Sequence, residues 1–323
     1  MSAPSSGRPL VSICMPAYNA SKWIGEAIES ALAQTWDNFE LVIADDASSD
    51  ATVAIARSYS DPRIRIETGP RNIGGPQNSN AAVRLSTGTY VKFLHADDTL
   101  APECVEEMVG LALENERTGL VFAQREILVE DENDLDWSQT YSKLHERFSH
   151  LQRSNEGHVL FTQLLDAGVE ENWIGEPSAV MVSRRCLEKT GLFNPHLHQI
   201  GDLELWLRIL LRHRVGFVDR PLCVYRRHRQ SSTAVNRRAG RDWLDRLWLL
   251  EGLLREDALG PEERETIERL RRAALRRAVR SQFARLMRRR FDREFPAYVR
   301  YRASRRGEEP RLPPRRRELE VAR

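Results

Sequence analysis

Apolar runs that alternate with helical patterns fill the first 125 residues of this 323-residue chain. The runs "LVSICMP" (10–16) and "FELVIADD" (39–46) are typical of strands covered on both faces. Between them, "SKWIGEAIESALAQTW" (21–36) is expected to form a helix capped by Ser21. Its apolar residues fall on one stripe: Ile24, Ala27, Ile28, Ala31 and Leu32. This alternation predicts an α/β fold with a mostly parallel sheet flanked by helices.

The same reading extends along the rest of the chain. It predicts a helix in "DATVAIARSY" (50–59), a strand in "RIRIE" (63–67), a helix around Ala81 to Leu85 after Gly74-Gly75-Pro76, a strand ending at His95, a helix with Pro102 in its first turn and its end near Asn115, and a strand over 119–124. The pattern weakens over 126–172, where "EDENDLDW" (130–137) is typical of a loop. A strand, a short helix and a turn are expected over 177–195, followed by an amphipathic helix over 201–213 with Glu204 on its surface. A strand over 215–219 comes next. Beyond Gly240 the sequence predicts arginine-rich helices with a break near 259–263.

Charge divides the chain into two unequal parts. The net charge is +2, yet residues 261–323 hold 21 arginines against 10 acidic residues, and the rest holds 28 basic against 37 acidic residues. The basic part includes a stripe of Leu270, Ala274, Ala278, Phe283, Leu286 and Met287 among arginines. Packing against the chain itself or dimerisation is the favoured interpretation, with peripheral membrane contact second. Nucleic-acid binding lacks the aromatic pattern that would support it.

Two classes of protein are disfavoured by composition. No apolar run approaches the ~18 residues of a membrane span, and "MSAPSSGRPL" lacks the form of a secretion signal, so a cytoplasmic location is expected. The cysteines Cys14, Cys104, Cys186 and Cys223 are far apart, which favours buried free thiols over a zinc or disulfide framework.

Acidic residues follow two of the expected strands. Asp45 and Asp46 end one run, and Asp97 and Asp98 follow "VKFLHA" (91–96) with no basic residue beside them. Because ligands bind at the carboxyl ends of parallel strands, these acids are expected at one edge of the sheet. Hard oxygen ligands suit Mn²⁺ or Mg²⁺ holding a diphosphate. The alternatives are a helix cap for the first pair and a solvated turn for the second.

Three segments together resemble a family 2 glycosyltransferase with a GT-A fold. They are "VSICMPAYNASKWIGEAIESALAQTWDNFELVIADDASSDAT", "RNIGGPQNSNAAVRLSTGTYVKFLHADDTLAPE" and "GDLELWLRI", within residues 9 to about 232. The resemblance implies sugar transfer with inversion from a nucleotide sugar, UDP-linked or another, to a hydroxyl of a glycan or lipid-linked acceptor in polysaccharide synthesis. It also implies a Rossmann-like central sheet.

The resemblance implies roles for particular residues. Pro16, Ala17, Tyr18, Asn19, Asn80 and one of Asp45 and Asp46 would contact the nucleotide. Asp97 and Asp98 would contact the ribose and the metal. Asp202 would be the general base, a role that inverting transfer requires of a carboxylate near the acceptor hydroxyl. A helix cap at Asp202, or Glu204 as the base, are the alternatives.

Other candidates lie in the second half of the chain. Arg226, Arg227, His228 and Arg229 in "VYRRHRQSST" (224–233) would face the diphosphate, unless this is a solvated basic loop. Trp173 and Glu176 are candidates for the acceptor site, although a core tryptophan is an equal reading. Two departures from the family pattern stand out: His95 replaces an acid, and Ser79 replaces an arginine whose contact would pass to Arg71 or Lys92.

Three rival functions remain at this point. A receiver domain would have its acid pair after the first strand and a later lysine, whereas Lys143 and Lys189 are the only lysines after Asp98. A nucleotidyltransferase would have a glycine-rich loop where "PAYNASKW" stands. An inactive nucleotide-sugar-binding protein is kept open by His95.

The domain organisation follows from the same resemblance. Residues 1–8 are expected to be disordered, 9–235 to form the glycosyltransferase domain, 236–300 to form a helical extension and 301–323 to form a disordered tail. Within the domain, 9–125 would be the nucleotide-binding half and 126–235 the acceptor half.

Overall fold

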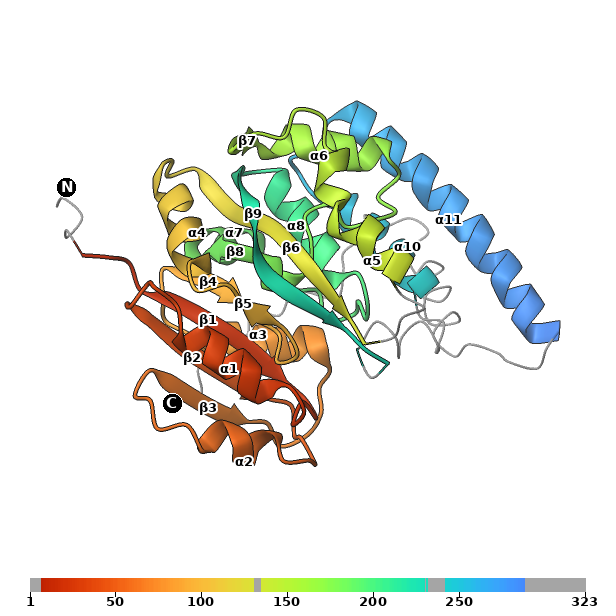
Figure 1. Cartoon of the computed structure of the whole chain (residues 1–323). Helices are drawn as coiled ribbons and strands as arrows, with labels where there is room; N and C mark the ends of the chain where they lie inside the picture. The colour runs from red at the N-terminus through yellow and green to blue at the C-terminus, as the bar shows by residue number, and fades with distance from the viewer. Residues whose placement is uncertain (1–6, 131–134, 230, 232–241, 288–323) are drawn as a thin grey trace, which may run out of the picture.

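The structure is a computed structural model that describes residues 7–130, 135–229, 231 and 242–287. One sheet has the strand order β3-β2-β1-β4-β8-β6-β9-β5, and β7 pairs with β9 (Figure 1). The strands are β1 (Val11–Ala17), β2 (Phe39–Asp45), β3 (Ile64–Thr68), β4 (Tyr90–Phe93), β5 (Thr99–Leu100), β6 (Thr118–Val129), β7 (Ser154–Glu156), β8 (Val180–Ser183) and β9 (Arg214–Arg227). The helices are α1 (Ile24–Leu32), α2 (Thr52–Arg57), α3 (Gly75–Leu85), α4 (Cys104–Leu113), α5 (Leu135–Ser142), α6 (Gly157–Asp166), α7 (Arg184–Thr190), α8 (Gly201–Leu210), α10 (Asp242–Leu253) and α11 (Pro261–Met287), with 3-10 helices η2 (Leu144–Arg147) and η3 (Pro177–Ala179).

Most neighbouring strands run parallel. β3, β2, β1 and β4 form a parallel set, and β6 is parallel to β9. β8 runs antiparallel between β4 and β6, and the short strands β5 and β7 are antiparallel to β9. The predicted α/β fold with a mostly parallel sheet is therefore confirmed.

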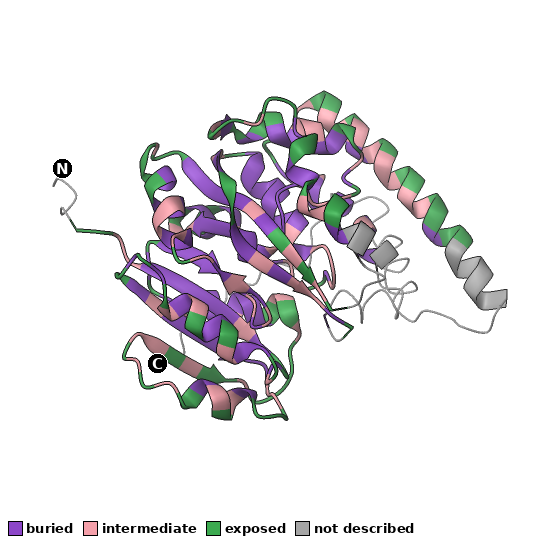
Figure 2. Cartoon of the chain, in the orientation of Figure 1, coloured by how far each residue is buried: buried purple, intermediate pink, exposed green. Residues whose placement is uncertain are grey.

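Side chains from alternate positions of β1 enter two separate cores. Ile13 and Met15 pack with residues of α1 and α4, whereas Cys14 packs on the other face with residues of α3 and α8. The central strands are accordingly buried along most of their length (Figure 2). Burial on both faces explains why "LVSICMP" lacks the polar alternation of a half-exposed strand.

Several predicted boundaries are wrong. α1 begins at Ile24 with Trp23 as its N-cap, so Ser21 does not cap it, and the backbone N–H of Ser21 donates to Asp50 at 3.1 Å. α3 begins at Gly75, so the expected Gly-Gly-Pro breaker is the start of that helix. Part of the expected loop at 130–137 belongs to α5, and β9 continues to Arg227.

Helix α8 differs from its predicted amphipathic form. Its residues from Leu203 to Leu210 are all buried. Glu204, expected on the surface, forms a buried ion pair with Arg208 at 2.8 Å, and Arg208 also donates to the Leu192 carbonyl at 2.7 Å. α8 is buried because α6, α7 and α10 contact it and its Trp206 ring packs against Phe93 of β4.

The arginine-rich extension packs on the body of the same chain. α10 contacts α8, and α11 contacts α10 and α6 (Figure 1). Ala278 is buried, and Leu270 and Ala274 pack against the core, which confirms the packing interpretation for this part of the stripe. Phe283, Leu286, Met287 and the tail 301–323 lie outside the residues whose side chains are described. The domain boundaries remain predictions.

Two other predictions concern the whole sequence. All four cysteines are buried free thiols, as expected. Within the described part of the chain, no helix has the length and apolar character to span a membrane.

Candidate active site

The carboxyl ends of β1 and β2 meet beside the start of α3. The backbone N–H of Asp46 donates to the Ala17 carbonyl at 2.9 Å, and Asn78 of α3 donates to the Ala44 carbonyl at 2.8 Å. Asn19 has a positive φ of 48°, and its side chain accepts a bond from the Ser49 N–H at 2.9 Å. These bonds fix the segment that contains Pro16, Ala17, Tyr18 and Asn19, where the Tyr18 ring is 51% exposed.

The two acids at the end of β2 have different surroundings. The carboxylate of Asp46 accepts bonds from the backbone N–H groups of Ile73 (2.7 Å) and Gly74 (2.9 Å). Oδ2 of Asp45 accepts one bond from the Ser48 N–H, whereas its Oδ1 is buried without a hydrogen-bond partner among the described residues. Neither acid caps α2, so that alternative is wrong. Of the pair, Asp45 has the acceptor atom available for a ligand.

Three potential metal ligands gather at the end of β4. One ligand atom each from His95, Asp97 and Asp98 lies within 4.8 Å of the others. Ser178 of η3 holds the group together, because its hydroxyl donates to Asp98 (2.5 Å) and accepts a bond from the His95 N–H (3.0 Å). Two carboxylates and an imidazole are ligands that Mn²⁺ and Mg²⁺ can use or tolerate.

Burial and mutual charge set the protonation of this group. Burial lowers the pKa of His95, which favours the neutral imidazole that a metal requires. Burial and the Asp97 carboxylate raise the pKa of Asp98 well above its usual range. Burial also acts to raise the pKa of Asp97, but the hydrogen bond with His228 and the charge of His95 outweigh it, and the pKa of Asp97 is lowered. A divalent cation would relieve the repulsion between the two acids.

The basic end of β9 and the residues that follow it contact these acids. The Arg226 N–H donates to Asp98 at 2.8 Å, and its guanidinium bonds the Asp97 carbonyl and Glu26 of α1. His228 Nε2 lies 3.0 Å from Asp97 Oδ2, and its ring lies 3.9 Å from that of Trp23. The solvated-loop interpretation is therefore wrong for Arg226 and His228. For Arg227 and Arg229, the contact with the diphosphate stays a prediction.

Asp202 occupies the first turn of α8. Its Oδ2 accepts a bond from the Asn172 side chain at 2.9 Å, and its Oδ1 accepts one from the Leu203 N–H at 2.8 Å. Asn172 also bonds both backbone groups of Gly175, a residue with φ of +117°. Burial is the main cause that raises the pKa of Asp202 to about 7, with a smaller contribution from Glu176. A carboxyl group with a pKa near neutrality is suited to take up a proton.

Glu176 connects Asp202 with the acids at β4. Its charge contributes to the pKa shifts of His95, Asp98 and Asp202, so all three lie near it. The buried Arg125 of β6 pairs with the Glu176 carboxylate and donates to the Tyr141 carbonyl at 3.0 Å. The predicted residues from distant parts of the chain thus share one neighbourhood.

Other predicted site residues are in structural positions. The Asn80 side chain is buried, and its amide nitrogen and oxygen each bond the backbone of Phe193 (2.8 and 3.0 Å), which gives it a structural role; its nucleotide contact stays a prediction. Trp173 is a core residue in edge contact with Phe148, which supports the core reading, and its acceptor role stays a prediction. Lys92 is fully buried and donates to the Ser178 carbonyl, so it cannot replace the missing arginine.

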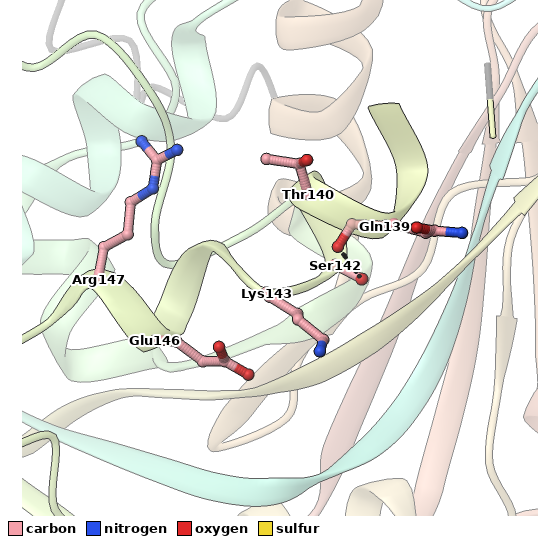
Figure 3. Close-up of a pocket in the computed structure, with 6 residues that line it drawn as sticks. All are labelled: Gln139, Thr140, Ser142, Lys143, Glu146 and Arg147. Atoms are coloured by element: carbon pink, nitrogen blue, oxygen red, sulfur yellow. Dashed lines mark hydrogen bonds between the residues drawn. The ribbon is translucent and has the colours of Figure 1, made fainter. Parts of the chain in front are cut away.

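A separate polar pocket of about 690 Å³ lies on α5 and η2 (Figure 3). Its lining residues are Gln139, Thr140, Ser142, Lys143, Glu146 and Arg147. None of them belongs to the group around His95 and Asp202. Its lining has no cluster of carboxylates, so we place the chemistry at the strand ends.

The family model described as Glycosyl transferase family 2 matches residues 12–168. The chain belongs to glycosyl transferase family 2. An uncharacterized protein of Mycobacterium tuberculosis (strain CDC 1551 / Oshkosh) is 35% identical to this glycosyltransferase over 254 residues, which cover 79% of this chain and 78% of that protein. The UDP-Glc:alpha-D-GlcNAc-diphosphoundecaprenol beta-1,3-glucosyltransferase WfgD of Escherichia coli is 38% identical over 106 residues, which cover 33% of this chain and 42% of that enzyme.

A solved structure shares the fold of this family 2 glycosyltransferase. The mannosyltransferase PcManGT from Pyrobaculum calidifontis, in complex with GDP-Man and Mn²⁺, superposes with a TM-score of 0.57 and 17% sequence identity, covering 93% of this chain and 81% of that one. The predicted GT-A fold is confirmed. Membership in the family sets aside the receiver-domain and nucleotidyltransferase interpretations.

Sequence reasoning missed Asn172, Ser178 and Arg125 of this glycosyltransferase. Each acts through a partner more than 25 residues away: Asn172 with Asp202, Ser178 with Asp98 and Arg125 with Glu176. A polar residue in an irregular segment gives no periodic signal. For Arg125, the one signal was its place at the end of an apolar strand, where a buried arginine is expected to pair with an acid.

Proposed function

We propose that this family 2 glycosyltransferase is metal-dependent and transfers a sugar from a nucleoside diphosphate to a hydroxyl group with inversion. The observation that carries the proposal is the ligand group of His95, Asp97 and Asp98, with atoms within 4.8 Å, together with a third carboxyl group, Asp202, whose pKa is about 7 and which shares the neighbour Glu176 with Asp98. One group suits a diphosphate-bound cation, and the other suits an acceptor proton.

The donor would lie across the ends of β1, β2 and β4. The buried Oδ1 of Asp45 would accept a bond from the nucleobase, and the exposed Tyr18 would cover it. Asp97, Asp98 and His95 would hold Mn²⁺ or Mg²⁺ and the ribose side of the donor. When bound, such an ion stabilises the negative charge that develops on the leaving diphosphate. Arg227 and His228 would add positive charge on the same side.

Asp202 would take the proton of the acceptor hydroxyl. Its Oδ2 is held by Asn172, and Oδ1 by a backbone N–H, so both oxygens have fixed directions. A carboxylate acting on the attacking hydroxyl, on the face opposite the leaving group, gives inversion. Glu176 would complete the acceptor side, where Arg125 holds it.

The acceptor class rests on relatives. WfgD, which matches a third of this chain, is a glucosyltransferase for a diphosphoundecaprenol-linked sugar. We therefore propose a glycan or lipid-linked glycan acceptor, made into a polysaccharide at the inner face of a membrane by a cytoplasmic enzyme. The mannosyltransferase bound to GDP-Man and Mn²⁺ supports a nucleotide-sugar donor and a divalent ion.

The test of the proposal uses Asp202→Asn. A thermal-shift screen of nucleotide sugars with and without Mn²⁺ first identifies a donor, because a ligand that binds the native state raises the melting temperature. Asp202→Asn is then expected to keep the donor-induced shift and to lose transfer by about 10²–10⁴-fold, the usual contribution of a general base. Unchanged transfer would remove Asp202 from this role.

An inactive nucleotide-sugar-binding protein is the second candidate. His95, where the family pattern has an acid, favours it because the site has one negative charge fewer. The same screen separates the two: binding of a nucleotide sugar without transfer or hydrolysis by the unaltered protein would favour this candidate.

A further inference from the structure

The helices α10 and α11 lie beyond residues 12–168, which the family model matches. We propose that α10 belongs to the active site and holds in place the two segments that carry Asp202 and its partner Asn172. The inference rests on the proposed function in that it takes Asp202 as the proton acceptor. Asp245 and Arg246, adjacent in α10, are the positioning residues.

Asp245 fixes the segment directly before α8. Its side chain is fully buried, and Oδ2 accepts bonds from the backbone N–H groups of His198 (2.8 Å), Gln199 (2.5 Å) and Ile200 (3.3 Å). Ile200 is the N-cap residue of α8, and Asp202 follows two residues later. Bonds from several backbone N–H groups to one carboxylate are stronger than bonds to a neutral acceptor. Asp245 therefore determines where the first turn of α8 begins.

Arg246 fixes the segment before Asn172. Its guanidinium donates to the carbonyls of Gly168 and Val169 and pairs with Glu170 at 3.2 Å. Gly168 and Val169 have positive φ angles of 79° and 55°. A left-handed conformation at a β-branched residue is costly and persists where surrounding contacts impose it. Arg246 supplies such contacts.

The two segments meet at the Asn172–Asp202 hydrogen bond of 2.9 Å. One partner of that bond follows the segment held by Arg246, and the other follows the segment held by Asp245. Apolar contacts through Leu249, Leu250 and Leu253 already pack α10 into the core. Asp245 is costly at this interface, because its Oδ1 is buried without a hydrogen-bond partner among the described residues and burial raises its pKa. We take its presence at this cost to indicate that the bonds to Oδ2 serve to position the segment before α8.

The experiment compares Asp245→Ala, Asp245→Asn and Arg246→Ala in the full-length chain. Asp257→Asn is the matched control, because Asp257 lies shortly after α10 and its side chain is 90% exposed. Its partner Arg212 also pairs with Glu256, so the substitution leaves Arg212 with one acid. The first readout is amide hydrogen exchange at residues 198–200. Asp245→Ala is expected to speed it by at least roughly tenfold, as loss of a charge-assisted bond predicts.

The second readout is the titration of the Asp202 carboxyl by carbon NMR, with Asp202→Asn used to assign the signal. Burial is the main cause of the Asp202 pKa of about 7, and the charge of Glu176 raises this pKa further. Asp245→Ala and Arg246→Ala are expected to admit water and lower that pKa toward the usual value. Asp245→Asn keeps a carbonyl oxygen for the same N–H groups and should stay near the parent protein.

The third readout is calorimetric binding of UDP with Mn²⁺, which should change less than threefold in every variant. Faster exchange with an unchanged Asp202 titration would overturn the proposal, as would an equal response in Asp257→Asn or a large loss of UDP binding. If Asp245→Ala fails to fold, the Asp202 titration of Arg246→Ala decides, with Asp245→Asn as the parent-like control. None of the readouts measures sugar transfer. Absence of transfer by the parent protein would therefore reject the proposed function, and the positioning role of α10 would still be decided by these three readouts.

Discussion

At single positions, burial decides what each acid of the site can do. Asp45 and Asp46 are adjacent and equally buried, yet backbone donors occupy both oxygens of Asp46, whereas one oxygen of Asp45 has no partner among the residues that the structure describes. Asp202 has two hydrogen bonds, and burial still holds its pKa near 7. The roles of these acids follow from their surroundings, since their side chains are the same.

Asp45 and Asp46 should therefore respond differently to substitution. Asp46→Ala is expected to destabilise the protein by about 1–3 kcal/mol, because the Ile73 and Gly74 N–H groups lose their acceptor. Asp45→Asn should weaken nucleotide binding with a smaller effect on stability. Urea unfolding and UDP calorimetry on both variants check this. Equal effects of the two substitutions on UDP affinity would contradict the assignment.

Asp202 should also make stability depend on pH. Its pKa is about 7 in the folded protein against a usual 3.8, so between these values the unfolded chain binds fewer protons. The free energy of unfolding must then fall as pH rises from 4 to 7, by up to roughly 1.4 kcal/mol per unit for a fully shifted group. Asp202→Asn should remove this dependence. Urea unfolding at pH 4.5 and 7 measures this dependence in the parent protein and in Asp202→Asn. The same change in the free energy of unfolding between the two pH values in both proteins would refute the prediction.

At the level of elements, the turn before η3 links the acids at the end of β4 with Asp202 in α8. Gly175 has φ of +117°, its carbonyl accepts a bond from the Trp206 indole at 3.0 Å, and a Cβ there would lie 3.1 Å from Arg125 Nη1. Glu176 and Ser178 follow directly. The conformation of this one turn therefore positions residues on both the metal side and the base side.

Gly175→Ala is expected to cost about 1–3 kcal/mol of stability, because the backbone conformation is unfavourable for a residue with a Cβ. It should also lower transfer more than donor binding, since Asn172, which bonds Asp202, also bonds both backbone groups of Gly175. Gly110→Ala is a fitting control: Gly110 lies within α4, and a Cβ there meets nothing within 4 Å. A Gly175→Ala protein with the stability and transfer rate of the parent would contradict this account.

The sequence predicted the elements that repeat a pattern and missed those that do not. Strands β1, β2 and β4 and their terminal acids follow from buried apolar runs, and the edge they share follows from parallel pairing. The buried Glu204–Arg208 pair broke the prediction for α8, because periodicity cannot tell an ion pair in the core from a polar surface. Asn172 and Ser178 were missed because their partners are distant along the chain.

Across the whole molecule, the acidic body and the arginine-rich extension form one structure rather than two separate parts. α10 contributes buried leucines and Asp245 beside α8, and α11 covers α10 and α6 (Figure 1). The charge asymmetry of the sequence separates residues 261–323 from the rest of the chain. It could not indicate that Asp245, in α10 before those residues, would accept bonds from the backbone next to Asp202.

The measurement that bears most directly on the central claim is calorimetry of UDP and GDP binding with and without Mn²⁺, on the parent protein and Asp97→Asn. Asp37→Asn is the control, since Asp37 is 81% exposed and pairs with Arg8. We expect Mn²⁺ to strengthen binding of at least one nucleotide by tenfold or more in the parent and control, as ~1.4 kcal/mol or more of metal bridging would give, and to have no such effect in Asp97→Asn. Nucleotide binding that ignores Mn²⁺, or that Asp97→Asn leaves unchanged, would contradict the claim.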